Sequence, residues 1–401
     1  MNILFVTADY VSPLSGGIAR MTYLLASALR SRGNNCISAY LKVKDPLRSK
    51  DDVFIEEYLL TKEAHNQQLQ DIIKTHNVDF VVVQGVDALM NRELMLIREV
   101  IKRQKRCVYI FFVFHQMPGY ELCEVDGGYL LRKIFSKDCV KYFKQLIIQI
   151  ISQVNKRYAC RQLYNKYSIP YTYADKIVLL SSSYIDAFNL LSAETDKTKY
   201  AVIPNMLTYS EEECCAEYTM KNPEVLIVAR MDEQAKRIKR ALQIWGRISQ
   251  EMLDKGWKLT IVGDGDDLAY YKEYVEKHRI KNVSFEGKQN PLPYYQKASI
   301  FMMTSALEGW PMTLMEAMQN GCVPIVFDSF KAAYDIVDSN KNGVVVPNND
   351  VDIYLKELVR LMRDDDYRQR LADNAMRDCK RFDKEYIVNQ WIELFNSYKN
   401  D

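Results

Sequence analysis

Short apolar runs recur along the whole chain, and between them apolar residues return every three or four positions. The runs are four to eight residues long, nearly continuous, and rich in Val, Ile and Phe. Strands of a parallel sheet that is covered by helices on both faces have this pattern. We therefore expect ten buried strands: Ile3–Thr7, Cys36–Tyr40, Phe80–Val83, Cys107–Phe114, Lys176–Ser181, Val225–Ala229, Lys258–Val262, Ser299–Met303, Val323–Phe327 and Gly343–Val346.

Helical periodicity is clearest at residues 21–29, 238–248 and 387–398, where the apolar side chains fall on one stripe. Strands that alternate with such helices predict an α/β fold with doubly wound parallel sheets. The strands form two series, so we expect two Rossmann-like domains.

An acidic segment without clear periodicity, Ser210–Glu217, separates the two series and is followed by Asn222-Pro223. We place the boundary there. The predicted parts are an N-terminal domain of residues 1–205, a C-terminal domain of residues 206–380, and a terminal helix, residues 381–401, that packs back on the N-terminal domain.

Composition narrows the class of protein. The 401 residues are 48% apolar and 26% charged, as in ordinary globular proteins, and the net charge of +2 gives no support for a nucleic-acid partner. The longest apolar run has eight residues, far short of the ~18 of a membrane helix. The first residues are expected to form a strand rather than a signal peptide, so the nine cysteines, an odd number, favour free thiols in a reducing cytoplasm. No Cys-x-x-Cys pair is present for zinc.

The most specific motif spans residues 305–321, after a predicted strand. Pro311 suits the first position of a helix and Gly321 the residue just after its end. The start of such a helix attracts phosphate oxygens, and carboxylates at Glu308 and Glu316 could accept hydrogen bonds from sugar hydroxyls. The alternative is a capped helix with one exposed glutamate at each end.

Two cations follow another predicted strand. Arg230 ends the strand and Lys236 lies near the next helix start, where a bound anion would explain a cation. Together they could neutralise the charge of a leaving diphosphate. In the alternative interpretation, Asp232 and Glu233 simply pair with them on the surface.

Weaker signals follow two strands of the first series. Gly16-Gly17 would let the backbone approach a ligand, but it is not Gly-x-Gly-x-x-Gly and no acid ends the second strand, which disfavours NAD(P). His115 ends a buried strand and could donate a hydrogen bond to a substrate oxygen, unless it is structural.

The segment from Gly263 to Asp267, Gly-Asp-Gly-Asp-Asp, has the residue types of a metal site. Its place between a predicted strand and a predicted helix favours a glycine turn with an aspartate as helix cap. We therefore expect no required metal.

In this order, Gly16-Gly17, His115, Arg230 with Lys236, Gly263-Asp-Gly265 and Glu308-x7-Glu316 resemble the retaining glycosyltransferases of family 4. The resemblance covers nearly the whole chain. It implies the GT-B fold, in which two Rossmann-like domains face each other across a cleft. It also implies metal-independent transfer by front-face attack, with the leaving phosphate receiving the proton of the acceptor.

The resemblance also implies roles for individual residues. Arg230 and Lys236 would hold the donor diphosphate, with Arg237 as an alternative to Lys236. Glu308 would contact the donor sugar and Glu316 the nucleotide ribose, while His115 would lie beside the transferred sugar. The remaining implied donor contacts are Gly16, Gly17, Gly263, Gly265, Gly309 and the backbone of Met312, Thr313 and Leu314.

Residues 130–166 are strongly basic, with a net charge of +8, in a first half (residues 1–190) whose net charge is +7. Large apolar residues are interleaved with the basic ones at helical spacing, which suits an anionic membrane surface. The alternative is a solvated helix face. The basic residues are Arg132, Lys133, Lys137, Lys141, Lys144, Lys156, Arg157, Arg161 and Lys166, and Asp138 is the one acid.

These observations predict a cytoplasmic retaining glycosyltransferase, attached peripherally to the inner face of the cell membrane. It would move a hexose-type sugar from a nucleotide-diphosphate sugar to a saccharide or lipid-linked glycan precursor in cell-surface polysaccharide biosynthesis. The alternatives are a nucleotide-sugar epimerase of the same architecture and a non-catalytic nucleotide-sugar-binding protein.

Overall fold

The chain divides into two compact units in a computed structural model. The structure describes residues 1–13, 16–43, 53–85, 88–104, 107–122, 143, 147, 156–214 and 221–399. The first unit comprises Met1–Gly119, Asn155–Met206 and Phe382–Asp401, and the second comprises Tyr120–Val154 and Leu207–Arg381.

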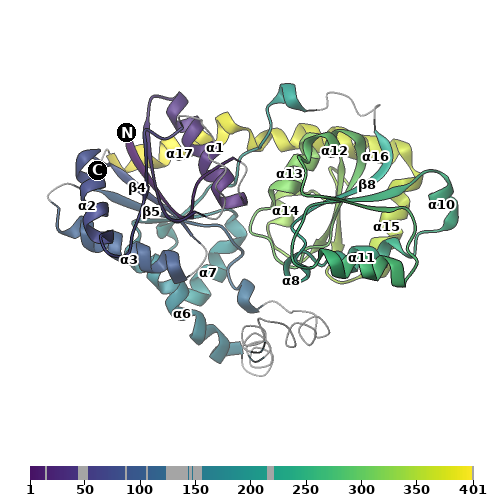
Figure 1. Cartoon of the computed structure of the whole chain (residues 1–401), viewed down its shortest axis with the longest axis horizontal. Coiled ribbons are helices and arrows are strands. Elements are labelled where there is room, and N and C mark those ends of the chain that lie inside the picture. Colours follow the sequence, from purple (N-terminus) through teal and green to yellow (C-terminus); the bar gives the residue numbers. More distant parts are fainter. Residues whose placement is uncertain are drawn as a thin grey trace. The chain divides into compact units, whose positions relative to one another are not determined.

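The first unit contains a parallel sheet whose seven strands have the order β3-β2-β1-β4-β5-β6-β7 (Figure 1). The central strands are buried on both faces, as their continuous apolar runs require. The strands are β1 (Asn2–Asp9), β2 (Asn35–Lys42), β3 (Glu56–Leu59), β4 (Phe80–Gly85), β5 (Tyr109–Phe114), β6 (Lys176–Leu179) and β7 (Tyr200–Val202).

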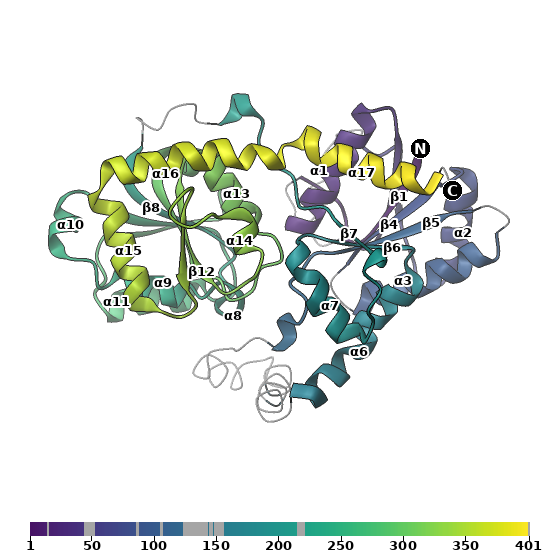
Figure 2. The same cartoon turned by 180° about the vertical axis from the view of Figure 1, so that it is seen from behind.

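Helices cover both faces of this sheet, with α1 and α17 on one face and α3, α6 and α7 on the other (Figure 2). The terminal helix packs through Phe395, whose ring centroid lies 4.7 Å from that of Phe80 and 5.5 Å from that of Phe111. The helices are α1 (Gly17–Ser31), α2 (His65–Thr75), α3 (Ala88–Lys102), α6 (Lys156–Tyr173), α7 (Ile185–Ser192) and α17 (Lys384–Lys399).

The second unit is built on a six-stranded parallel sheet of order β10-β9-β8-β11-β12-β13. The strands are β8 (Asn222–Val228), β9 (Lys258–Val262), β10 (Val283–Gly287), β11 (Ala298–Met303), β12 (Val323–Asp328) and β13 (Val344–Pro347).

In the second unit, α9, α11 and α15 enclose the main apolar core on one face of the sheet, and α12 and α13 lie on the other (Figures 1 and 2). The helix α16 contacts α13 and also contributes Tyr367, Leu371 and Ala372 to the core. Among the described residues, no helix has the length and apolar character to cross a bilayer. The helices are α8 (Glu233–Lys236), α9 (Ile238–Trp245), α10 (Gln250–Asp254), α11 (Leu268–Lys277), α12 (Leu292–Lys297), α13 (Met312–Gln319), α14 (Ala333–Ile336), α15 (Val351–Arg363) and α16 (Asp365–Asp378).

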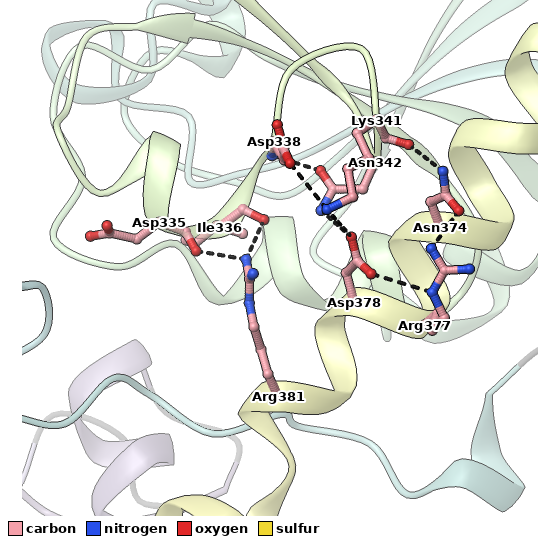
Figure 3. Close-up of polar contacts among 9 residues, drawn as sticks. All are labelled: Asp335, Ile336, Asp338, Lys341, Asn342, Asn374, Arg377, Asp378 and Arg381. Carbon is pink, nitrogen blue, oxygen red and sulfur yellow. Dashed lines mark hydrogen bonds and ion pairs between the residues drawn. The ribbon is translucent and has the colours of Figure 1, made fainter.

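Aspartate caps fix the starts of the last two helices of the second unit. Asp350 accepts a hydrogen bond from Ile353 N at 2.9 Å, and Asp364 accepts one from Tyr367 N at 2.9 Å. Polar contacts also join α16 to the loop before β13 (Figure 3). The Arg381 guanidinium donates to the carbonyl oxygens of Asp335 and Ile336, which end α14, at 2.7 and 3.0 Å.

All ten predicted strands are present in parallel sheets, and the three predicted helices are α1, α9 and α17. Three strands, β3, β7 and β10, were not predicted. Each of them lies at the edge of its sheet. All three are partly exposed and lack a continuous apolar run, whereas the edge strand β13 has such a run and was predicted.

Candidate functional site

A salt bridge joins two of the predicted site residues. The Lys236 ammonium lies 2.6 Å from Glu308 Oε1, and the side chains are 22% and 10% exposed. Lys236 ends α8, which follows β8, and Glu308 follows β11, the neighbouring strand in the sheet. The two charges meet because the carboxyl ends of adjacent parallel strands share one edge of the sheet.

Backbone contacts hold the Glu308 loop against the end of α8. Ala306 N donates to Ala235 O at 2.8 Å, and the Thr304 hydroxyl lies 3.1 Å from the carbonyl oxygens of both Lys236 and Arg237. Because the partner atoms belong to the backbone, the loop is fixed independently of the salt bridge.

Lys236 and Glu308 line a small cavity, the Lys236 cavity, which Thr313 at the start of α13 also lines. Pro311 precedes α13 and makes no side-chain capping hydrogen bond to it. Pro311 is thus the cap rather than the first helical residue as predicted, while Gly321, with φ +71°, follows the helix as predicted. A cation and an uncapped helix start therefore border the same cavity.

Glu316 lies in the second turn of α13 and is 2% exposed. Its Oε1 accepts a hydrogen bond from the Thr208 hydroxyl at 2.8 Å, and its Oε2 accepts one from the Tyr295 hydroxyl at 3.0 Å. Glu316 is therefore not the exposed glutamate of the alternative interpretation.

Arg230 does not line the Lys236 cavity; its side chain is 69% exposed and pairs with Asp232 at 2.7 Å. This pair is the one that the surface interpretation proposes for Arg230, whereas Lys236 pairs with Glu308 instead. Arg237 donates to the side-chain oxygens of Asn348 and Asn349 at 3.1 and 3.0 Å. Of the two candidate cations after Arg230, Lys236 is the one beside Glu308.

Gly263 and Gly265 pack against the backbone that follows β8. Their φ angles are +141° and +155°, and a Cβ on Gly263 would lie 1.9 Å from the Ala229 carbonyl oxygen. A Cβ on Gly265 would lie 2.7 Å from the Met231 carbonyl oxygen. Both positions therefore require glycine because of backbone packing, apart from any contact with a ligand.

Asp267, which follows these glycines, forms a hydrogen bond with the start of α8. Asp267 occupies the cap position of α11, as predicted, but makes no capping bond there. Its carboxylate accepts a hydrogen bond from Glu233 N at 2.9 Å, at the start of α8. Glu233 is itself buried, and desolvation raises its pKa to about 7.

His115 follows β5 in the first unit, and its Nε2 contacts Oε1 of Gln84, a buried residue of β4. Burial lowers the pKa of His115 to about 4. Both residues line a cavity of the first unit, the His115 cavity. Its other lining residues are Met21, Leu25, Val113, Leu180, Ile203, Pro204, Asn205, Met206, Ile387 and Trp391.

Gly16 is the cap of α1 and Gly17 its first residue, and a Cβ on Gly16 would meet no atom within 4 Å. Gly309 and Leu314 are buried, and Met312 and Thr313 are partly exposed. Most of the basic segment lies outside the described residues, so the membrane hypothesis stays a prediction. Phe143 and Ile147, two apolar residues of this segment, are 54% and 41% exposed.

The structure thus brings Lys236, Glu308 and Thr313 together and places Arg230 and Glu316 outside the cavity lining. Sequence reasoning missed the residues that contact the predicted site residues. They are above all Gln84 beside His115, Thr304 beside Lys236 and Tyr295 beside Glu316. Only Gln84 left a signal in the sequence, as a polar residue directly after the apolar run Phe80–Val83.

Residues 217–378 match the family model for glycosyl transferases group 1. The chain is 28% identical over 232 residues to the amylovoran biosynthesis glycosyltransferase AmsD of Erwinia amylovora, covering 56% of this chain and 63% of that protein. It is 27% identical over 229 residues to an alpha-1,4-N-acetyl-D-galactosaminyltransferase of Campylobacter jejuni, which acts on a diNAcBac-PP-undecaprenol-linked glycan, covering 55% and 63%. The alignments therefore span slightly less than two thirds of these relatives.

The fold is similar to that of Anabaena Alr3699/HepE in its crystal structure with UDP. The TM-score is 0.71 at 14% identity, and the match covers 99% of this chain and 100% of that one. The likeness at this identity concerns the fold alone. It confirms the prediction of the GT-B fold, with two parallel-sheet α/β domains.

Proposed function

Because residues 217–378 match the family model for glycosyl transferases group 1, we propose that the protein is a retaining glycosyltransferase. It transfers a hexose-type sugar from a nucleotide-diphosphate sugar to a saccharide or lipid-linked glycan precursor. The observation that carries the proposal is the salt bridge between Lys236 and Glu308 beside the start of α13.

Lys236 and the α13 start supply the positive charge that a diphosphate needs. The ammonium is only partly exposed, so its attraction to a phosphate oxygen is screened less than that of a surface lysine. The first N–H groups of α13, including those of Met312 and Thr313, can bind other phosphate oxygens. As the bond to the sugar breaks, these groups stabilise the charge that collects on the leaving diphosphate.

Glu308 is an acceptor for hydroxyl groups of the donor sugar. When a phosphate draws the ammonium of Lys236 toward itself, Glu308 Oε1 is released from the salt bridge and can accept from a hydroxyl. Glu316 would accept hydrogen bonds from ribose hydroxyls, because its carboxylate, which Thr208 and Tyr295 orient, is a hydrogen-bond acceptor. Arg230 would leave Asp232 for the diphosphate, a change that its exposed position allows.

The acceptor hydroxyl attacks the face of the sugar that the diphosphate leaves, so the anomeric configuration is retained. The leaving phosphate oxygen takes the acceptor proton. We propose that His115 contacts the transferred sugar, and that Gly16 and Gly17 allow close approach of the backbone to the donor. Residues 130–166 would bind an anionic membrane surface and bring the enzyme to a lipid-linked acceptor.

The function is tested by incubating the protein with UDP-, GDP- and ADP-sugars and following both nucleoside diphosphate and free nucleotide sugar. A transferase releases the diphosphate, slowly by hydrolysis without an acceptor. An epimerase instead converts the free nucleotide sugar, and a binding protein changes nothing. Glu308→Ala and Lys236→Ala should abolish release while the fold is kept, and full activity in either variant would contradict the assignment.

The membrane proposal has its own test, sedimentation with liposomes that contain anionic lipid. We expect binding that depends on the anionic fraction and that falls when lysines of residues 130–166 are changed to Gln. Binding that is independent of lipid charge, or unchanged in the variants, would reject membrane attachment without affecting the proposed reaction.

A further inference from the structure

Gln84 is the one polar side chain of β4, and in the register of the sheet it lies opposite Val113 of β5, two residues before His115. It is 3% exposed. Burying a polar group destabilises the fold unless the group is hydrogen-bonded. The side chain of Gln84 contacts the imidazole of His115. The proposed function gives Gln84 no role.

The orientation of the Gln84 amide favours one tautomer of His115. Gln84 faces His115 Nε2 with its amide oxygen, and an amide oxygen only accepts hydrogen bonds. With the amide in this orientation, His115 Nε2 is the nitrogen that carries the proton. Because burial lowers the pKa of His115 to about 4, the neutral ring carries one proton near pH 7. The other nitrogen, Nδ1, then has a free lone pair.

The surroundings keep this pair in place. His115 N donates to Gly85 O at 3.2 Å, next to Gln84 in β4. A Cβ on Gly85 would lie 2.8 Å from both Met90 Cβ and Phe112 Cζ, so the strands pack tightly here. Among the described side chains that line the His115 cavity, that of His115 alone is titratable; the others are apolar, except the amides of Gln84 and Asn205.

We propose that Gln84 is a positioning residue that holds His115 in the Nε2–H tautomer, so that His115 presents Nδ1 to the sugar as a hydrogen-bond acceptor. Nδ1 would accept from a sugar hydroxyl, which reverses the donor role that the sequence suggested for His115. The contact with a sugar rests on the proposed function, whereas the tautomer does not.

The tautomer can be measured directly, because the chain has four histidines. Nitrogen NMR spectra of protein labelled with ¹⁵N-histidine report the proton on each ring nitrogen, and the His115→Gln variant assigns the signal. We expect His115 to be neutral and protonated on Nε2 at pH 7. A proton on Nδ1, or a charged ring, would overturn the proposal with no variant needed.

Two substitutions test the part played by Gln84. Gln84→Leu has no acceptor and should let His115 populate both tautomers. Gln84→Glu keeps an acceptor and should preserve the Nε2–H form, and its negative charge should raise the pKa of His115. The signals of His65, His76 and His278 report whether the fold is kept. An unchanged His115 tautomer in a folded Gln84→Leu variant would overturn the proposal.

The rate of sugar transfer gives a separate test of the positioning role of Gln84. Loss of one oriented hydrogen bond should lower kcat about tenfold in Gln84→Leu. In Gln84→Glu, kcat should equal the wild-type value at high pH and fall as the pH falls, because His115 then becomes an imidazolium, which has no lone pair. Equal rates for Gln84→Leu and the wild type would overturn the positioning role. If the wild type transfers no sugar, the proposed function fails, and the spectra still decide the tautomer.

Discussion

Substitution of Gly263 by alanine tests whether close backbone packing shapes the donor site. The added Cβ would lie 1.9 Å from the Ala229 carbonyl oxygen and 3.3 Å from Met231 Cε. The carbonyl cannot yield freely, because Ala229 N is bonded to Val262 O at 3.0 Å. The φ of +141° is also one that alanine adopts only with strain.

Both effects contribute to the expected loss of stability. The strained φ costs about 1–3 kcal/mol, and overpacking costs typically about 1–3 kcal/mol more. Gly287→Ala is a matched control in the same unit, because its φ is +70° and a Cβ there meets no atom within 4 Å. It should cost only the strain of a left-handed residue, about 1–2 kcal/mol.

Urea unfolding of the two variants measures the difference. We expect Gly263→Ala to lose about 2 kcal/mol more than Gly287→Ala at an unchanged m-value. Gly263→Ala should also weaken donor binding, because the displaced backbone carries Arg230. Equal free energies of unfolding for the two variants would refute the packing argument for Gly263.

Two further predictions concern stability. The pKa of Glu233 rises from 4.5 in the unfolded chain to about 7 in the fold, so the folded chain binds this proton more tightly. The free energy of unfolding should therefore fall by about 3 kcal/mol between roughly pH 4.5 and 7 through this group. Glu233→Gln should remove that component in unfolding curves measured across this range, and an unchanged slope would reject it. Phe395→Ala should cost the first unit about 3–5 kcal/mol, since the ring is fully buried, whereas Tyr386→Ala on the same helix, at a 58% exposed residue, should stay within about 0.5 kcal/mol. Equal urea midpoints for these two variants would refute the packing of the terminal helix.

The central strands could be predicted because burial on both faces leaves a continuous apolar run. The edge strand β3 reads Glu-Glu-Tyr-Leu and is largely exposed, so its pairing with β2 is invisible in its sequence. In β10, a register shift at Glu286 between Phe285 and Gly287 further breaks the pattern. These two strands depend on pairing with their neighbours, which a local pattern does not contain.

Site residues could be predicted from the sequence where a charged residue lies in the loop after a buried strand. Lys236 and Glu308 follow strands that turned out to be neighbours, so topology brought them together. Topology does not determine which side chains pair. Arg230 forms a salt bridge with Asp232, and Glu316 accepts hydrogen bonds from the hydroxyls of Thr208 and Tyr295. Such partners lie far apart in the sequence, and only the folded chain reveals them.

Calorimetric titration of the wild type, Lys236→Met and Glu308→Gln with UDP, GDP and ADP, and then with the matching nucleotide sugar, tests the donor site most directly. Lys236→Met should weaken binding of the preferred diphosphate at least tenfold, because it removes a charge-assisted contact. Glu308→Gln should bind that diphosphate as the wild type does and bind the nucleotide sugar more weakly. Wild-type affinity for both ligands in both variants, or binding of none of the three diphosphates to the wild type, would contradict a donor site at Lys236 and Glu308.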